Sequence, residues 1–217
     1  MHRLFRRRPG AGEVFMLAGF AVAAAVTVVL VLPSAPVSAQ WTSSPAGPLG
    51  PADRDLLAKV RQAGLWEIPT GQQALQRAAS PKVKDVAMHL IEDHTKLDVT
   101  TRQVAARLGV PLPSLPTADQ QRWMAQLSGK TGAAYDQDFA DLLRAAHGKV
   151  FSVVASVRAG TRNAEIRAFA QRAVVVVMKH MTLLEATGLV DFDALPEPPT
   201  PSPLPTAALA ADFRRNP

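Results

Sequence analysis

Three of the five histidines in the sequence stand at positions from which they could converge on one metal ion. His94, His147 and His180 each lie in a long stretch of helical periodicity, on the face that carries its apolar residues. Glu67 is the one ionisable residue on the corresponding face of an earlier stretch. A buried imidazole must satisfy both ring nitrogens or bind a metal, and imidazole with carboxylate suits Zn, Fe, Mn, Ni or Cu(II). The pattern therefore predicts a mononuclear site for one divalent transition metal.

Asp136, on the same face as His147, is a further candidate ligand, although an aspartate near a helix start commonly interacts with the helix dipole. The alternative to a metal site is a core in which the histidines form structural hydrogen bonds. Dinuclear iron bundles carry Glu-x-x-His on two helices, whereas Ile91 and Val177 occupy the glutamate positions here. A dinuclear centre is therefore not predicted.

Long helices must position these side chains. Residues 80–109 begin with Ser80 as a helix cap and Pro81 in the first turn, and they end at Gly109, which permits a left-handed stop. Similar periodicity predicts helices at about 51–79, 132–159 and 163–187, the last including the AVVVV run at 173–177. A short amphipathic helix is expected at 117–127, after a proline-punctuated segment. The predicted class is all-α, a four-helix bundle with one short extra helix in the crossing connection.

The depth of each candidate along its helix can be compared from the positions of the turns. Glu67 and His94 are nearly equidistant from the turn at 79–81, so they fall in one layer. His147 and His180 differ in depth by about 7 Å at 1.5 Å per residue, so His147 is a ligand only where helix tilt or side-chain reach absorbs about one turn, and it misses the site otherwise. Pro69 is expected to kink or break the first helix close to Glu67.

The ends of the chain differ in composition from the predicted bundle at 51–189. Residues 1–39 combine an arginine-rich start, a 19-residue uncharged run at 14–32 and a small-residue Val-Ser-Ala sequence, which together indicate a signal peptide or a signal anchor. Both alternatives place the bundle outside the cytoplasmic membrane, held by residues 14–32 if the signal is not cleaved. Residues 40–50 are expected to be a linker, and the proline-rich residues 190–217 a disordered tail.

Composition excludes several classes of protein. The sequence has no cysteine, which excludes disulfides, thiolate ligands and a lipoprotein anchor. Half of the formal net charge of +6 lies in the first 39 residues, and no stripe of basic and aromatic residues follows, so nucleic-acid binding is not expected. No pairing of a nucleophile with a base is evident, which makes an enzyme less favoured than a binding protein.

Residues 55–187 resemble an exported bacterial family of unknown function, domain of unknown function four-one-four-two, often labelled "predicted outer membrane protein". The matching motifs are AGLWE (63–67), ALQRAASPKVKDVAMHLIEDHTKL (74–97), LGVPLPS (108–114), LSGKTGAAYDQDF (127–139), AAH (145–147) and KH (179–180). The resemblance implies an extracytoplasmic ferritin-like four-helix bundle. The matching site positions are Glu67, Asp93, His94, Asp136, His147 and His180.

Three functions fit these observations. The first is an extracytoplasmic bundle that binds one mononuclear metal ion. The second is a structural or interaction protein of the cell envelope, without metal, whose histidines are hydrogen-bonded in the core. The third is a metal-dependent oxidoreductase that acts in a stress response.

Overall fold

The computed structural model describes residues 41–197. The predicted signal peptide or anchor at 1–39 and most of the predicted tail, from residue 198 onward, lie outside this range. Within residues 41–197, every helix is too short or too polar to cross a membrane.

The described residues form an all-helical domain, as predicted. Its helices are α2 (Pro51–Arg77), α3 (Pro81–Leu108), α4 (Ala118–Ser128), α5 (Gly132–Gly160) and α6 (Ala164–Glu185). The short helix α4 lies in the connection between α3 and α5, where it was expected, and the valine-rich residues 173–177 are helical within α6. The all-α class and its extra helix are therefore confirmed.

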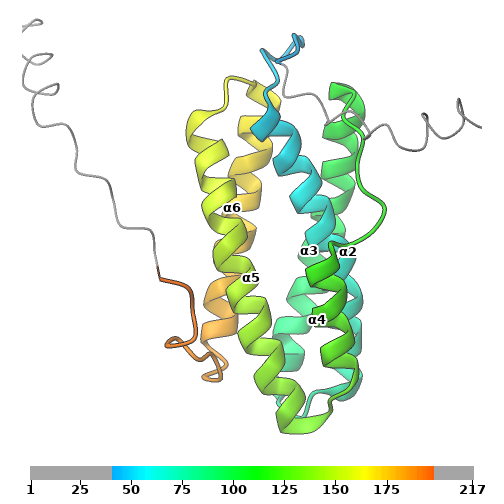
Figure 1. The fold of residues 1–217 in the computed structure, drawn as a ribbon, viewed down its shortest axis with the longest axis vertical. Helices are drawn as coiled ribbons and strands as arrows, with labels where there is room; N and C mark the ends of the chain where they lie inside the picture. The colour runs from blue at the N-terminus through cyan, green and yellow to red at the C-terminus, as the bar shows by residue number, and fades with distance from the viewer. Residues whose placement is uncertain (1–40, 198–217) are drawn as a thin grey trace, which may run out of the picture.

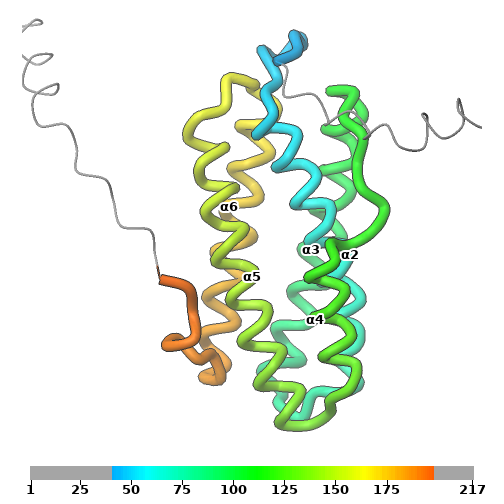
Figure 2. Tube along the Cα trace, in the orientation of Figure 1, coloured from blue at the N-terminus to red at the C-terminus, as the bar shows by residue number. Residues whose placement is uncertain are grey.

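The four long helices form two antiparallel pairs, α2 with α3 and α5 with α6 (Figures 1 and 2). The connection from α3 to α5 returns along the length of the bundle, and α4 is its last part. Helix α3 also packs against α6, and α2 against α5, so the four helices enclose one central core. One long crossover of this kind is the connectivity of ferritin-like bundles.

The predicted helix ends at 80 and 109 are confirmed, and of the kink or break predicted at Pro69 the break is wrong. The Ser80 side chain accepts a hydrogen bond from the Val83 amide, and Gly109 has a left-handed φ of 65°. Helix α2 continues through Pro69 to Arg77. Trp66 and Thr70 lie on either side of this proline and are both buried. Packing of this kind stabilises the helix enough to compensate for the one backbone hydrogen bond that proline cannot donate.

The segment at 41–50 packs against the bundle, although the sequence predicted a linker. Thr42 and Leu49 form an antiparallel bridge, and the Leu49 side chain is buried. The Asn163 side chain caps α6 and also donates to the Ser44 hydroxyl and the Gly47 carbonyl. Gly47 has a φ of 107°, and a Cβ there would come within 2.6 Å of the Arg162 carbonyl oxygen, so glycine is required at this contact.

The core consists of two apolar clusters at different heights of the bundle. One contains the first part of α2 with the last part of α3, and the other contains the last part of α2 with the first part of α3. Helices α5 and α6 contribute to both clusters. The four predicted ligands Glu67, His94, His147 and His180 belong to neither cluster. On α3, α5 and α6 the histidine lies between the residues of one cluster and those of the other, and on α2 Glu67 directly follows Trp66 of the second cluster. A polar layer therefore divides the core.

Candidate metal centre

The polar layer brings together one side chain from each long helix: Glu67 of α2, His94 of α3, His147 of α5 and His180 of α6. All four are buried, and one nitrogen or oxygen of each lies within 4.8 Å of those of the others. His94 Nε2 is 2.9 Å and His147 Nε2 is 3.4 Å from Glu67 Oε2, while His147 Nε2 is 3.1 Å from His180 Nδ1. The arrangement could hold a metal ion.

His147 lies in this group, so the difference in depth that the sequence indicated is absorbed. The depth comparison used Cα positions, but helical side chains are inclined toward the N-terminus of their own helix. Because α5 and α6 are antiparallel, the His147 ring is inclined away from the turn that joins them and the His180 ring toward it. The two inclinations close the difference in depth.

Asp136 is not part of the group, so its predicted role as a ligand needs correction. Its two carboxylate oxygens accept hydrogen bonds from the Ala79 and Ser80 amides, at 3.1 and 2.8 Å. These amides belong to the turn that starts α3, where amides lack helical partners and a negative charge is favourable. Asp136 therefore caps a neighbouring helix.

In His147 and His180 one ring nitrogen, here called the outer one, faces away from the other three side chains of the group, and the inner nitrogen faces them. The hydrogen bond of the outer nitrogen determines which ring nitrogen carries the proton. His147 Nδ1 is 2.8 Å from the Leu143 carbonyl oxygen, which can only accept. His180 Nε2 is 3.0 Å from the Asp93 carboxylate, which also accepts from Lys179. Each outer nitrogen is thus the donor, and in a neutral ring the inner nitrogen has a free lone pair.

The inner nitrogens of His147 and His180 consequently point two lone pairs at each other across 3.1 Å. In the other half of the layer, Glu67 Oε2 and both ring nitrogens of His94 are buried without a hydrogen-bond partner. His94 Nε2 nevertheless lies 2.9 Å from Glu67 Oε2, a contact that becomes an ion pair when the ring is protonated. Buried polar atoms are nearly always paired, so these contacts require an explanation.

The charge states follow from burial and from the mutual influence of the four groups. Burial by itself would raise the pKa of the Glu67 carboxyl, but the ring charges of His147 and His94 outweigh it and hold that pKa at about 2. Burial lowers the pKa of His147, and it lowers that of His180 to about 3. Burial would also lower the pKa of His94, yet the Glu67 carboxylate raises it above its usual value. A carboxylate and two neutral imidazoles thus face the centre of the layer.

The resemblance includes Asp93 among the site positions, but reasoning from helix faces did not assign it a role. Its carboxylate orients the His180 ring, and the Lys179 ammonium lies 2.7 Å from the same oxygen. The available signal was the Asp-His pair at 93–94, because successive helical residues point about 100° apart and can face two neighbouring helices. Asp98 lies four residues after His94, but its carboxylate pairs with Arg61 and Arg102 and does not orient a histidine of the group.

The fold and the layer together define a four-helix bundle with a buried group of three histidines and one glutamate. Residues 38–187 match the family described as Domain of unknown function (DUF4142), and the chain belongs to this family. Comparison with curated proteins found no match.

Two solved structures share the fold. A DUF305 fragment from Deinococcus radiodurans superposes with a TM-score of 0.55 at 14% identity, over 63% of this chain and 95% of the fragment. The structure of CopM in the Cu(II)-bound form superposes with a TM-score of 0.53 at 13% identity, over 62% of this chain and 94% of that one. At these identities the likeness concerns the fold alone.

Proposed function

We propose that the bundle binds one divalent transition metal ion through Glu67, His94, His147 and His180. The observation that supports this function best is the pair of lone-pair-bearing nitrogens of His147 and His180 at 3.1 Å. A proton between them would need a cationic ring, which the lowered pKa values of both histidines oppose. A metal ion would accept both lone pairs, and it would also satisfy the unpartnered atoms of His94 and Glu67.

The spacing of the inner atoms agrees with such an ion. A tetrahedral site with bonds of about 2.0–2.1 Å places its ligand atoms about 3.3 Å apart. The three short separations among the inner atoms are 2.9, 3.1 and 3.4 Å. The outer partners agree as well, because metal-binding histidines generally donate their second nitrogen to a carboxylate or a backbone carbonyl. Asp93 and the Leu143 carbonyl have these roles here.

The chemical nature of the donors favours certain metals. Three imidazoles and a carboxylate suit Cu(II), Zn(II) and Ni(II), and none of the four donors is a sulfur atom, the type preferred by Cu(I). Divalent affinity usually rises along the series to Cu(II), and CopM, whose structure shares this fold, was solved in a Cu(II)-bound form. Copper(II) is therefore the first metal to test.

The direct test is metal analysis of the protein purified without a histidine tag. Protein exposed to excess Cu(II), Zn(II) or Ni(II) and then desalted should retain one ion per chain for at least one of these metals. A variant with both Glu67→Gln and His147→Gln should retain none. If the folded wild-type protein retains no metal, the better explanation is the second function, a structural or interaction protein of the cell envelope whose histidines are hydrogen-bonded in the core.

Replacing Asp93 should weaken metal binding without removing a ligand. In Asp93→Asn the acceptor of the His180 proton becomes an amide, which holds the ring less firmly and makes it less basic. We expect metal affinity to fall by about 10–100-fold, the usual effect of changing such a partner. Isothermal titration would measure it, with Asp98→Asn on the same helix as the control. Equal affinities for the two variants would contradict this role.

We further propose that the bundle functions outside the cytoplasmic membrane. The support is the sequence of residues 1–39, with its arginine-rich start, uncharged run and small residues at 37–39. A topology reporter fused after Pro217 should be active only in the exported compartment. Activity in the cytoplasm would exclude export, and the N-terminal sequence of the exported protein would separate a cleaved signal from an anchor.

A further inference from the structure

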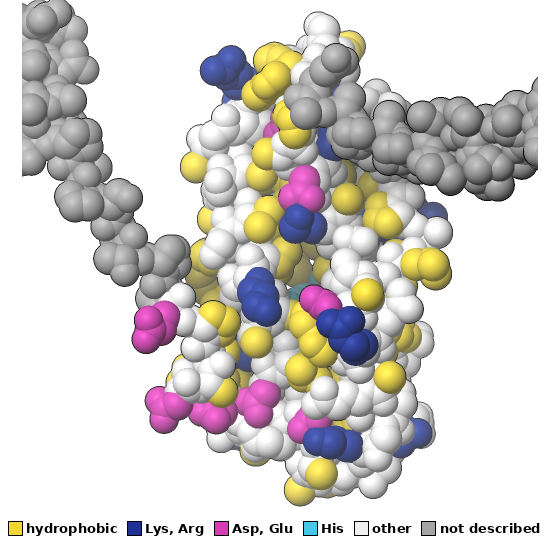
Figure 3. Space-filling view, in the orientation of Figure 1, with side chains coloured by type: hydrophobic (Ala, Val, Ile, Leu, Met, Phe, Trp, Pro, Cys, Tyr) yellow, Lys and Arg dark blue, Asp and Glu magenta, His cyan; other side chains and the backbone are white. Residues whose placement is uncertain are grey.

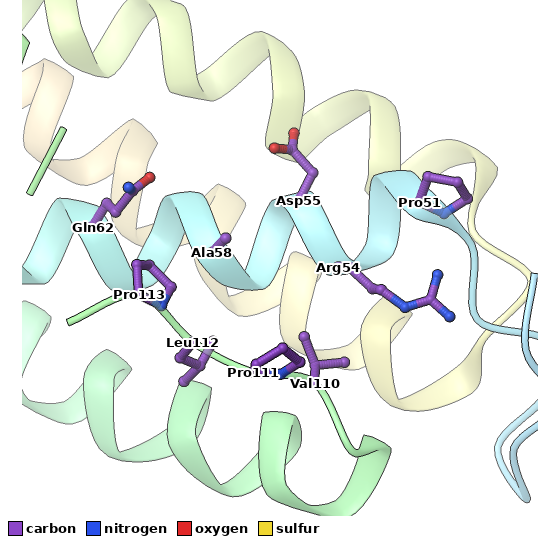
Figure 4. A pocket seen from close by; sticks show the side chains of 9 residues that line it. All are labelled: Pro51, Arg54, Asp55, Ala58, Gln62, Val110, Pro111, Leu112 and Pro113. Atoms are coloured by element: carbon purple, nitrogen blue, oxygen red, sulfur yellow. The ribbon is translucent and has the colours of Figure 1, made fainter. Parts of the chain in front are cut away.

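A cleft leads from the surface to the polar layer between α2, α4 and α5. It has a volume of about 330 Å³, and Glu67 is one of its lining residues. Figure 3 shows a hollow at the middle of the bundle face, with a histidine side chain visible in its depth. A larger hollow of about 590 Å³, formed by the start of α2 and residues 110–113, has none of the four candidate ligands in its lining (Figure 4). Only the first of these two hollows reaches the candidate ligands.

The walls of this cleft leave room for a molecule next to Glu67. Trp66 and Trp123 form one side, with ring centroids 5.4 Å apart. Ala63 and Ala146 also line the cleft, and their small side chains do not fill the space in front of Glu67. Ala146 directly precedes His147 on α5, so the cleft and the polar layer share a turn of this helix.

The charges around the cleft favour an anion. A divalent ion with the Glu67 carboxylate and three neutral imidazoles has a net charge of +1. Lys149 lines the cleft, is exposed, and has no ion-pair partner within residues 41–197. The carboxylate of Asp119 also lines it but is paired with Arg122. The excess charge at the end and at the rim of the cleft is therefore positive.

We propose that the cleft admits a small anion, which binds the metal as an exogenous ligand beside Glu67. This inference rests on the proposed metal site. Cu(II) and Ni(II) accept more than four ligands, so an anion can add to the four protein donors or replace the Glu67 oxygen. The tryptophan wall limits the access of water on one side, which strengthens the attraction between the anion and the metal.

The experiment uses the full-length protein loaded with Cu(II), with azide as the probe anion. Azide bound to Cu(II) produces a charge-transfer absorption band, which reports binding independently of any activity. Wild-type protein should show a saturable band. Ala146→Leu adds bulk inside the cleft and should weaken azide binding by about tenfold or more, since a clash of about 1.4 kcal/mol suffices for this factor. Ala145→Leu adds the same bulk outside the cleft and should leave azide affinity unchanged.

A second variant tests the charge argument without altering the shape of the cleft. Lys149→Gln removes an exposed charge and should weaken azide binding by up to about fivefold at low salt, with a smaller effect at high salt. This variant also covers the case in which Ala146→Leu does not fold, because unchanged azide affinity and salt dependence would then contradict the proposal.

The outcomes separate this inference from the proposed function. Wild-type protein that binds Cu(II) but shows no azide band would overturn the anion site and leave the metal site intact. Equal azide affinity in Ala146→Leu and Ala145→Leu would show that the anion does not enter through this cleft. Failure to bind Cu(II) would overturn the anion site as proposed, and failure to bind Cu(II), Zn(II) and Ni(II) alike would overturn the proposed function as well.

Discussion

His94→Gln is expected to abolish the stabilisation of the protein by metal. At a free metal concentration about a hundredfold above the dissociation constant, binding should add about 2.7 kcal/mol to the free energy of unfolding of the wild-type protein. The His94 ring supplies one of the four inner atoms, and its Nε2 lies 2.9 Å from Glu67 Oε2. Without this ring the ion loses a ligand, so the variant should gain little stability from metal. Denaturant unfolding with chelator and with Cu(II), Zn(II) or Ni(II) measures the difference.

His89→Gln is the matched control, because His89 is a half-buried histidine on the same helix and is not part of the buried group of four. It should retain the full metal-dependent gain. A structural role for His94 would give a different result: the variant would lose about 0.5–3 kcal/mol with chelator and with metal alike. If no metal stabilises the wild-type protein, the three histidines are core residues and the proposed site is wrong.

Acidification provides a second readout for the same wild-type protein. The Glu67 carboxylate raises the pKa of His94, so below that raised value the ring is protonated in the metal-free protein. Metal must then displace this proton, and affinity should fall by about tenfold per pH unit for each proton released. Above the raised pKa this dependence disappears. Affinity that increases on acidification would exclude His94 as a ligand.

The fold was accessible from the sequence because its signals are local. The caps at Ser80 and Gly109 and the spacing of apolar residues on each helix determine where helices begin, end and bury a face. The predicted break at Pro69 was wrong because packing on both sides of a proline is a tertiary effect, which the local sequence does not indicate. The packing of residues 41–50 depends on the Asn163 side chain far along the chain, which no local pattern indicates.

The site was predictable as far as helix faces determine it. Glu67, His94 and His180 come together because each lies on the buried face of its helix. Asp136 shares that property but lies near the end of the bundle, where the amides of the α3 turn bind its carboxylate. Residue type and face therefore identify candidates. Inclination of side chains and competition from backbone amides decide which candidates meet.

The polar layer should reduce the stability of the metal-free protein. Glu67 and His94 occupy core positions with three polar atoms that lack hydrogen-bond partners. Replacing a buried ionic pair by apolar residues of similar volume is often neutral or stabilising by about 1–4 kcal/mol. The double variant with Glu67→Leu and His94→Leu should thus unfold at higher denaturant concentration than wild-type protein when both are measured with chelator.

The sign of this change, together with the response to added metal, separates a metal site from a hydrogen-bonded core. A core held together by these two side chains would lose stability in the double variant, because their interactions would be absent and nothing would replace them. Glu67→Leu alone is the control: it leaves the buried His94 ring without its anionic neighbour, so this single variant should be less stable than the double variant. Added metal should raise the stability of wild-type protein and leave that of the double variant unchanged. A double variant less stable than metal-free wild-type protein would show that the layer is structural.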